Sequence, residues 1–169
     1  GDAPRKNTKR LVESFIDFCA SIDGWSLVVI GLSQRLIKEL RYLVDEAGIS
    51  KRFVFKTYIK DEDVPLLLST ANAFIFPSIY EGFGLPLLDA MACGCPILSS
   101  NLTSLPEIAG DAALYFDTLD KATITKCLLN FTQEDGLAAH MTELGYKRNS
   151  DFTWDKTAQA TLNVFKEVV

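Results

Sequence analysis

The sequence predicts an α/β fold in which helices cover both faces of a parallel β-sheet. Short runs rich in β-branched and aromatic residues alternate with longer segments whose apolar residues recur at the period of a helix. The short runs are largely apolar, which is typical of strands that are buried on both faces of a parallel sheet. From about residue 121 the pattern is helical only, so we expect a helical C-terminal tail.

The expected strands and helices follow one another in regular order. The strands are expected at 26–31 (SLVVIG), 52–55 (RFVF), 73–77 (AFIFP), 95–99 (CPILS) and 113–116 (ALYF). The helices are expected at 8–20, 33–47, 63–70 and 85–92, with Asn7 as the N-cap of the first and Gly48 at the end of the second. The first helix has no strand before it, although a doubly wound sheet would place one there. We therefore expect residues 1–169 to be a single domain that is a fragment and lacks its first strand.

Composition excludes several classes of protein. The chain is 48% hydrophobic and 23% charged, which fits a soluble globular domain and not a disordered segment. No apolar run reaches the roughly 18 residues of a membrane span, and no apolar segment follows the basic start as in a signal peptide. A net charge of −5 argues against nucleic acid as a partner and leaves only a small basic site at Arg5 and Lys6.

The four cysteines predict no metal or redox site. Cys93 and Cys95 are spaced as Cys-x-Cys, which differs from the Cys-x2-Cys of zinc and thioredoxin-like sites. With Cys19 and Cys127, they are interpreted as small hydrophobic residues. Reduced thiols and the lack of a signal peptide favour a cytoplasmic protein.

The stretch SIYEGFGLPLLDAMACGCP, residues 78–96, is the best candidate for a ligand site. It follows an expected strand, and ligands of open α/β sheets bind outside the carboxyl ends of the strands. Glu81 precedes a Gly-Phe-Gly turn, Pro86 suits a first helical turn, and the helix N-terminus would favour an anion such as a diphosphate. Asp89, about one turn inside the helix, could accept two hydrogen bonds from a ribose. A nucleotide-sugar clamp and a plain capped helix explain this spacing equally well.

A longer match separates these two interpretations. The segment FPSIYEGFGLPLLDAMACGCPILSSNLTSLPEIAGDAALYFD, residues 76–117, resembles the nucleotide-sugar-binding half of retaining GT-B glycosyltransferases, specifically glycosyltransferase family 4. That family carries the frame P-S-x-x-E-G-F-G-L-P-x-x-E-A-M-A-x-G-x-P. The segments PRKN, VVIG and DFTWDKTAQATLNVFKEV extend the resemblance to almost the whole chain.

The resemblance implies a fold and an activity. The fold would be Rossmann-like, the C-terminal half of a GT-B fold, with the N-terminal acceptor domain missing. The full enzyme would move a hexose from a UDP- or GDP-linked sugar to a glycan or lipid-linked acceptor, with retention, in synthesis of an O-antigen-like bacterial surface polysaccharide. It would need no metal or resident cofactor. It would work at the inner face of the membrane, which it would contact only through the missing domain.

The resemblance also implies roles for individual residues. Glu81 falls on the first Glu of the frame, beside the donor sugar, and Asp89 falls on the second, which holds the ribose. Lys6 matches a basic residue that neutralises the diphosphate, so Glu81 and Lys6 are the expected catalytic pair. The backbone expected to meet the sugar and phosphates is that of Phe83, Gly84 and Leu85. The loop expected to contact the base is 56–60, with Tyr58.

The chain departs from the family pattern at three points. Asp89 is one methylene shorter than the family Glu, and Thr57 stands where a Gly is usual. The family's diphosphate-binding Arg lies at the end of the first strand, before this chain begins. The alternatives are a sugar-nucleotide epimerase, a glycogen- or sucrose-type synthase domain, or a non-catalytic nucleotide-binding domain. The retained Glu81, Lys6 and Gly-Phe-Gly-Leu argue against the non-catalytic alternative.

Other candidate sites are weaker. The acids 61–63 form an Asp-x-Asp, a metal motif of another glycosyltransferase fold, but they precede a helix and are expected to cap it. His140 is the only histidine, and the segment 31–33 lacks the rest of a dinucleotide-binding motif. Trp25 and Trp154 are expected in the core or in a domain contact. No metal site is predicted.

Overall fold

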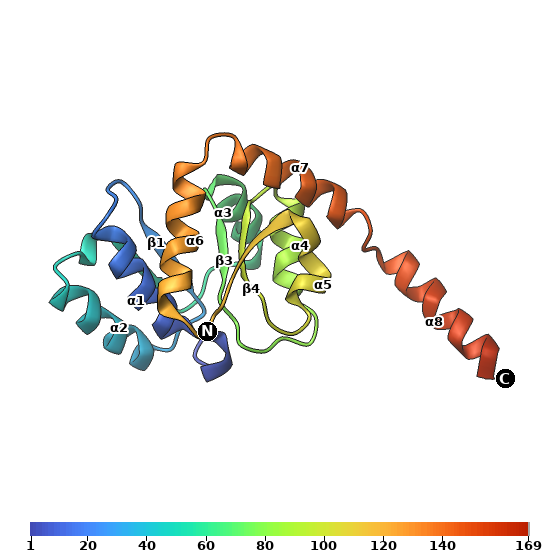
Figure 1. The fold of residues 1–169 in the computed structure, drawn as a ribbon. Helices are drawn as coiled ribbons and strands as arrows, with labels where there is room; N and C mark the ends of the chain where they lie inside the picture. The colour runs from blue at the N-terminus through green and yellow to red at the C-terminus, as the bar shows by residue number, and fades with distance from the viewer. Residues whose placement is uncertain (169) are drawn as a thin grey trace.

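The computed structural model, described here for residues 1–168, confirms a parallel α/β fold (Figure 1). The strands are β1 Leu27–Ile30, β2 Phe53–Lys56, β3 Phe74–Phe76, β4 Ile97–Ser100 and β5 Ala113–Phe116. Every pairing between them is parallel. The strands form two separate groups, β1 with β2 and β3 with β4 and β5, rather than one continuous sheet.

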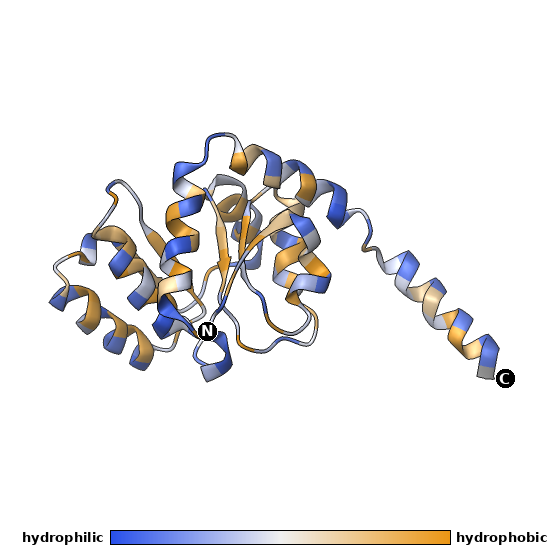
Figure 2. Cartoon of the chain, in the orientation of Figure 1, coloured by the Kyte–Doolittle hydropathy of each residue, from blue (hydrophilic) through white to orange (hydrophobic). Residues whose placement is uncertain are grey.

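Helices cover both faces of these strands. The longer helices are α1 Thr8–Cys19, α2 Gln34–Glu46, α3 Val64–Thr70, α4 Leu85–Ala92, α5 Leu105–Ala109, α6 Lys121–Gln133, α7 Leu137–Asn149 and α8 Trp154–Val168. Short 3-10 turns lie at η1 Pro4–Lys6, η2 Ser50–Arg52, η3 Asp61–Asp63 and η4 Gly110–Ala112. One apolar core joins α1, α2 and α6 to the strands, and a second joins α4 and α5 to the other face. The strands are apolar and the helices turn polar residues outward (Figure 2).

Four boundary predictions met different outcomes. Gly48 follows α2 with a φ of 70°, and Pro86 lies in the first turn of α4, both as expected. Asn7 does precede α1, but its side chain makes no capping hydrogen bond because it reaches toward Thr118 instead. The acids 61–63 directly precede α3, as expected, but the expected capping of α3 by their side chains was wrong. They form η3, and no side chain caps α3 by a hydrogen bond.

The C-terminal tail is helical, as predicted, but its last helix stands away from the rest. After α6 and α7, helix α8 projects from the body of the domain (Figure 1). Trp154, at its start, is 82% exposed and therefore lies outside the cores of the described residues. Trp25 is packed on the core, with edge contacts to Phe18 and Phe131. None of the helices within residues 1–168 has both the length and the apolarity of a membrane span.

Candidate functional site

The candidate site lies where the N-terminal segment meets the loop after β3. The backbone N–H of Ile79 donates to the carbonyl of Arg5 at 2.7 Å, and the Arg5 guanidinium donates to the carbonyl of Tyr80 at 3.2 Å. These contacts join residues more than 70 positions apart in the sequence. They place η1 at the carboxyl end of β3, where a ligand of an α/β sheet is expected.

Two cations converge on Glu81 at this point. Glu81 Oε1 accepts a hydrogen bond from Lys6 Nζ at 2.7 Å and lies 2.9 Å from Arg5 Nη1. The Glu81 side chain is only 12% exposed. Lys6 Nζ also lies 5.1 Å from the centre of the Phe76 ring, within the range of a cation–π contact. The cluster has one more positive than negative charge, so it can attract an anion.

The protonation state of Glu81 follows from these neighbours. Its burial raises the pKa, but the hydrogen bond from Lys6, the neighbouring Ser78 hydroxyl and the charges of Lys6 and Arg5 together outweigh burial and hold the pKa below its ordinary value. Glu81 is therefore ionised at neutral pH. An ionised carboxylate can accept hydrogen bonds from sugar hydroxyls as well as from the two cations.

A second network fixes the backbone just after Lys6. Asn7 adopts a left-handed conformation with a φ of 54°, and its Nδ2 donates to the carbonyl and hydroxyl oxygens of Thr118 at 2.7 and 2.8 Å. Thr118 is fully buried, and its hydroxyl donates to the carbonyl of Pro77 at the end of β3. Sequence analysis missed this role of Asn7. The available signal was an Asn directly after Lys6, because Asn adopts the left-handed conformation more readily than most residues.

The turn that carries Glu81 is held by hydrogen bonds to the segment before α5. The backbone N–H of Glu81 donates to the Thr103 hydroxyl at 3.2 Å, and the Ser104 hydroxyl bonds to the carbonyls of Glu81 and Phe83 at 3.0 and 2.8 Å. Gly84 has a φ of 112°, and a Cβ there would come within 2.9 Å of Leu105 Cδ2. Gly84 is thus required both by its backbone conformation and by close packing.

The structure brings together some of the predicted residues and separates others. Asp89 is exposed on the second turn of α4 and lines the same cavity as Lys6 and Ser78. The Phe83 ring packs edge-on against Phe152, with centroids 5.9 Å apart, yet Phe83 remains 43% exposed. Leu85 is exposed at the start of α4, and the Tyr58 side chain is 67% exposed. The hydroxyl of Ser78, fully buried, has no hydrogen-bond partner within residues 1–168.

The weaker candidates form no metal site. No three His, Cys, Asp or Glu side chains within residues 1–168 gather as they would around a metal ion, and this includes the acids 61–63. His140 is exposed on α7. Burial raises the pKa of the Cys95 and Cys127 thiols to about 11, which fits their interpretation as small hydrophobic residues.

Known proteins share both this sequence and this fold. The O-antigen chain mannosyltransferase B of Escherichia coli is 43% identical over 164 residues, which cover 96% of this chain and 43% of the relative. The C-terminal domain of the glycosyl transferase group 1 family protein LpcC of Francisella tularensis is 26% identical, with a TM-score of 0.78 over 88% of this chain and 80% of that one. The Anabaena HepE structure with UDP and glucose has a TM-score of 0.84 at 17% identity, over 98% and 46% of the two chains, which shows the fold alone.

These matches confirm the expected C-terminal half of a GT-B fold. The chain spans 43% of the length of the Escherichia coli mannosyltransferase. It corresponds to most of a structure that consists of a C-terminal domain. Residues 2–148, which include the whole candidate site, match the family model described as "Glycosyl transferases group 1". The chain therefore belongs to the glycosyl transferases group 1 family.

Proposed function

We propose that residues 1–169 are the donor-binding domain of a retaining GT-B enzyme of glycosyltransferase family 4 that transfers mannose from a nucleoside diphosphate sugar. The observation behind this proposal is the cluster of Arg5, Lys6 and Glu81 at the carboxyl end of β3. Its net positive charge lies where a diphosphate would bind in this fold. Mannose is proposed because the relative with 43% identity is named a mannosyltransferase.

Catalysis would be mainly electrostatic. In the proposed reaction, the bond between the anomeric carbon and the diphosphate oxygen breaks, and its electron pair leaves with the diphosphate. Lys6, Arg5 and the first N–H groups of α4 would face this growing negative charge. They would interact more strongly with the transition state than with the bound donor, which lowers the barrier. The acceptor hydroxyl oxygen then forms the new glycosidic bond with retained configuration and gives its proton to the departing diphosphate oxygen, without a required metal.

The carboxylates would orient the donor. Glu81, held ionised by its two cations, would accept hydrogen bonds from the sugar hydroxyls. Asp89, one turn further along α4, would accept hydrogen bonds from the ribose hydroxyls, either directly or through a water. The backbone from Phe83 to Leu85 would meet the sugar and phosphates. The exposed loop 56–60, with Tyr58, would contact the base.

The full enzyme would use a second domain to hold the acceptor. The chain spans less than half of its 43%-identical relative, which leaves room in such a protein for an acceptor domain. That relative is named for the O-antigen chain, so a glycan or lipid-linked acceptor of surface polysaccharide synthesis is proposed. The reaction would take place at the cytoplasmic face of the membrane, which the enzyme would contact through the acceptor domain.

Calorimetry with nucleotides and nucleotide sugars tests this proposal in the full-length enzyme. GDP, UDP and ADP, with GDP-mannose and UDP-glucose, are titrated with and without EDTA. We expect binding of GDP or UDP and of the matching sugar nucleotide, unchanged by EDTA. Lys6→Ala should weaken the binding about 10- to 100-fold, because a hydrogen bond to a charged group contributes about 1.5–3 kcal/mol.

A matched control variant is Lys9→Ala. Lys9 lies in the first turn of α1, 4.0 Å from Glu13 and away from Glu81, so its loss should leave nucleotide binding unchanged. Strict dependence of binding on Mg²⁺, or equal affinity of the Lys6→Ala and wild-type enzymes, would contradict the proposal.

A further inference from the structure

Thr103 adopts a backbone conformation that a β-branched residue rarely takes. Its φ is 55°, and within residues 1–168 only one other non-glycine residue, Asn7, has a positive φ. At a positive φ the Cβ of an L-residue crowds its own backbone, and a branched Cβ makes this crowding worse. A residue in such a conformation persists only where the surrounding structure fixes it, and such residues cluster at functional sites.

The turn that contains Thr103 would accept glycine without this strain. Leu105 N–H donates to the carbonyl of Leu102 at 3.4 Å, which closes a four-residue turn with Thr103 and Ser104 at its centre. Thr103 has a positive φ, and Ser104 has a φ of −76°. This combination is that of a type II′ turn, whose first central position favours glycine. The turn alone therefore gives no reason for a threonine side chain at this position.

The side chain of Thr103 binds the backbone of Glu81. Its hydroxyl accepts a hydrogen bond from Glu81 N–H at 3.2 Å. The next residue, Ser104, places its hydroxyl 3.0 Å from the carbonyl oxygen of Glu81, to which it can donate. Two consecutive hydroxyl residues, Thr103 and Ser104, thus hold both polar backbone groups of Glu81, and we name this pair the hydroxyl clamp. Glycine at position 103 would lose the first of these bonds.

The side-chain contacts of Glu81 would weaken when a diphosphate binds. The Glu81 carboxylate lies 2.7 Å from Lys6 Nζ and 2.9 Å from Arg5 Nη1. Under the proposed function these two cations also face the diphosphate, so the anionic ligand would compete with Glu81 for their N–H groups. The hydroxyl clamp binds only the backbone of Glu81 and involves neither cation. It can therefore hold Glu81 whether or not the ligand is present.

We propose that Thr103 is a positioning residue that fixes Glu81 in the donor-bound enzyme. The proposal rests on the proposed function, because that function assigns Glu81 to the donor sugar. Thr103 holds the N–H of Glu81 and Ser104 holds its carbonyl, so the carboxylate stays within reach of the sugar hydroxyls while Lys6 and Arg5 bind the diphosphate. The positive φ of Thr103 is the conformational cost of placing its hydroxyl beside the Glu81 N–H.

Three substitutions in the full-length enzyme separate the hydroxyl of Thr103 from its backbone strain. Thr103→Ser keeps the hydroxyl and a Cβ, Thr103→Ala keeps only the Cβ, and Thr103→Gly keeps neither. Because glycine tolerates a positive φ, Thr103→Gly should have a Tm roughly 2–5 °C above that of Thr103→Ala.

The kinetic effect should follow the hydroxyl and not the Tm. Thr103→Ala and Thr103→Gly should both lower kcat roughly 5- to 10-fold, as expected for one lost hydrogen bond, with a smaller change in donor KM. Thr103→Ser should keep kcat within about twofold of wild type. Wild-type kcat in Thr103→Ala or Thr103→Gly would overturn the proposal.

Gly136→Ala is the matched control for backbone strain. Gly136 lies between α6 and α7 with a φ of 79°, and a Cβ there would meet no atom within 4 Å. This substitution should lower the Tm and leave kcat and KM unchanged. If Gly136→Ala lowered kcat as much as Thr103→Ala does, lost stability alone would explain the kinetic effect, and the proposal would be wrong.

A double-mutant cycle tests whether Thr103 acts through Glu81. Once Glu81→Gln has removed the ionised carboxylate, Thr103→Gly should lower kcat no further, because no carboxylate is left to position. If the two losses multiplied instead, Thr103 would act independently of Glu81, and the assigned role would be wrong.

Hydrogen exchange at the Glu81 amide tests the hydroxyl clamp without any donor. In the full-length protein this amide should exchange roughly 5- to 10-fold faster in Thr103→Ala and Thr103→Gly than in wild type and Thr103→Ser. The Leu98 amide, in β4 between β3 and β5, is the internal control and should stay protected in all four proteins. Equal exchange of Glu81 in all four would overturn the proposal. Failure of the proposed function would appear instead as a wild-type enzyme that binds no nucleotide, and it would leave the exchange result intact.

Discussion

At the scale of single residues, Glu81 connects the stability of the site with its proposed chemistry. It is nearly buried and contacts both Lys6 and Arg5. Removing one partner of such an ion cluster leaves the remaining charges poorly compensated. The resulting loss of folding stability exceeds the stability that a surface ion pair contributes. Substitutions at Glu81 should therefore affect folding and donor chemistry together, whereas Asp89, exposed on α4, should affect the donor only.

The two carboxylates should differ in enzyme kinetics. Asp89 would contact the ribose, which does not change during the reaction, so Asp89→Asn should raise the donor KM and largely keep kcat. Glu81 would contact the sugar, which gains positive character as the diphosphate leaves, so Glu81→Gln should lower kcat with a smaller change in KM. Steady-state kinetics of the full-length enzyme over a donor concentration series checks both.

The exposed Glu62 offers a control for these variants. Its carboxylate pairs with Lys60 on the surface of η3, so Glu62→Gln should leave both constants unchanged. The assigned roles would be wrong if Glu81→Gln changed KM alone, or if Asp89→Asn abolished kcat at saturating donor.

The stability that Glu81 contributes should depend on pH. Burial raises its pKa, but Lys6 and Arg5 lower it by more than burial raises it, so the pKa in the folded protein lies below the ordinary value of 4.5. Folding then favours the ionised form. The contribution is complete above the unfolded pKa and is lost as the pH falls through the folded pKa. We expect the difference in unfolding free energy between wild type and Glu81→Gln to be constant from about pH 7 to 6 and to shrink below about pH 4.5.

Urea unfolding at several pH values measures this difference. A difference that persists unchanged at pH 3, or one that appears only at alkaline pH, would show that the ion cluster does not set the effect. The Glu62→Gln protein serves again as the control, because its ion pair is exposed and should contribute little at any pH.

At the scale of elements, the placement of η1 depends on side chains more than on its own helical hydrogen bonds. η1 has only three residues, and no side chain caps it. Its position follows from the contacts of Arg5 with the loop after β3 and of Asn7 with Thr118. Lys6 lies between these two anchors, so either anchor should influence where its amine points.

Substitution of Asn7 tests this arrangement. Asn7→Ala removes the hydrogen bonds to Thr118 and places an alanine in a left-handed conformation, so it should destabilise the protein by about 1–3 kcal/mol. Asn7→Gly removes the same bonds without the backbone cost and should destabilise less. Arg10 also donates to the Thr118 carbonyl at 3.1 Å, which limits the loss in both variants.

Urea unfolding of the two Asn7 variants measures the loss of stability, and nucleotide titration measures the change in affinity. Both variants should also weaken nucleotide binding if Asn7 positions Lys6, whereas Asn130→Ala, exposed on α6, should change neither property. A loss of stability without any loss of nucleotide affinity would limit Asn7 to a structural role.

The elements themselves could be predicted from the sequence because their signals are local. Each expected strand and helix begins and ends within two residues of the observed element, since apolar runs and helical periodicity mark the buried surfaces directly. The resemblance likewise named Lys6 and Glu81, which lie 2.7 Å apart in the structure, while the roles of both and of Asp89 stay predictions. The contact between Asn7 and Thr118 could not be predicted, because it joins residues 111 positions apart and depends on how the elements pack. The separation of the strands into β1–β2 and β3–β5 could not be predicted from the order of the strands either, although the missing first strand was expected.

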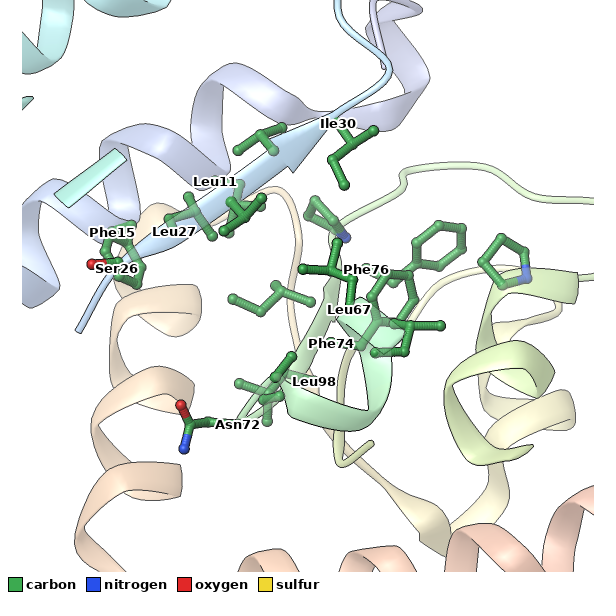
Figure 3. Close-up of a pocket in the computed structure, with 18 of the residues that line it drawn as sticks. Leu11, Phe15, Ser26, Leu27, Ile30, Leu67, Asn72, Phe74, Phe76 and Leu98 are labelled. Carbon is green, nitrogen blue, oxygen red and sulfur yellow. The ribbon is translucent and has the colours of Figure 1, made fainter. Parts of the chain in front are cut away.

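At the scale of the whole molecule, two apolar surfaces of residues 1–168 are not packed against the rest of the domain. One is the cavity between β1 and β3 (Figure 3). The other is α8, which projects from the domain (Figure 1) and exposes Trp154, Leu162 and Phe165. The expected domain contact of Trp154 stays a prediction. Under the proposed function, the donor domain works with an acceptor domain outside these residues, since the chain spans 43% of the length of its 43%-identical relative.

The 169-residue chain should therefore bind nucleotide weakly and transfer no sugar. Transfer needs an acceptor hydroxyl held against the anomeric carbon, and proximity of this kind can account for about 7–11 kcal/mol of a barrier. The residues assigned to the donor do not include an acceptor site, so the chain alone would supply charge stabilisation without this proximity. Incubation of the chain with radiolabelled donor and lipid-linked acceptor should yield no glycosylated product, while the full-length enzyme under the same conditions should yield it. Slow hydrolysis of the donor by the chain would be compatible with this view, because water needs no acceptor domain. Sugar transfer by the 169-residue chain at a rate near that of the full-length enzyme would show that the acceptor site lies within these residues, and the division of the enzyme into a donor and an acceptor domain would then be wrong.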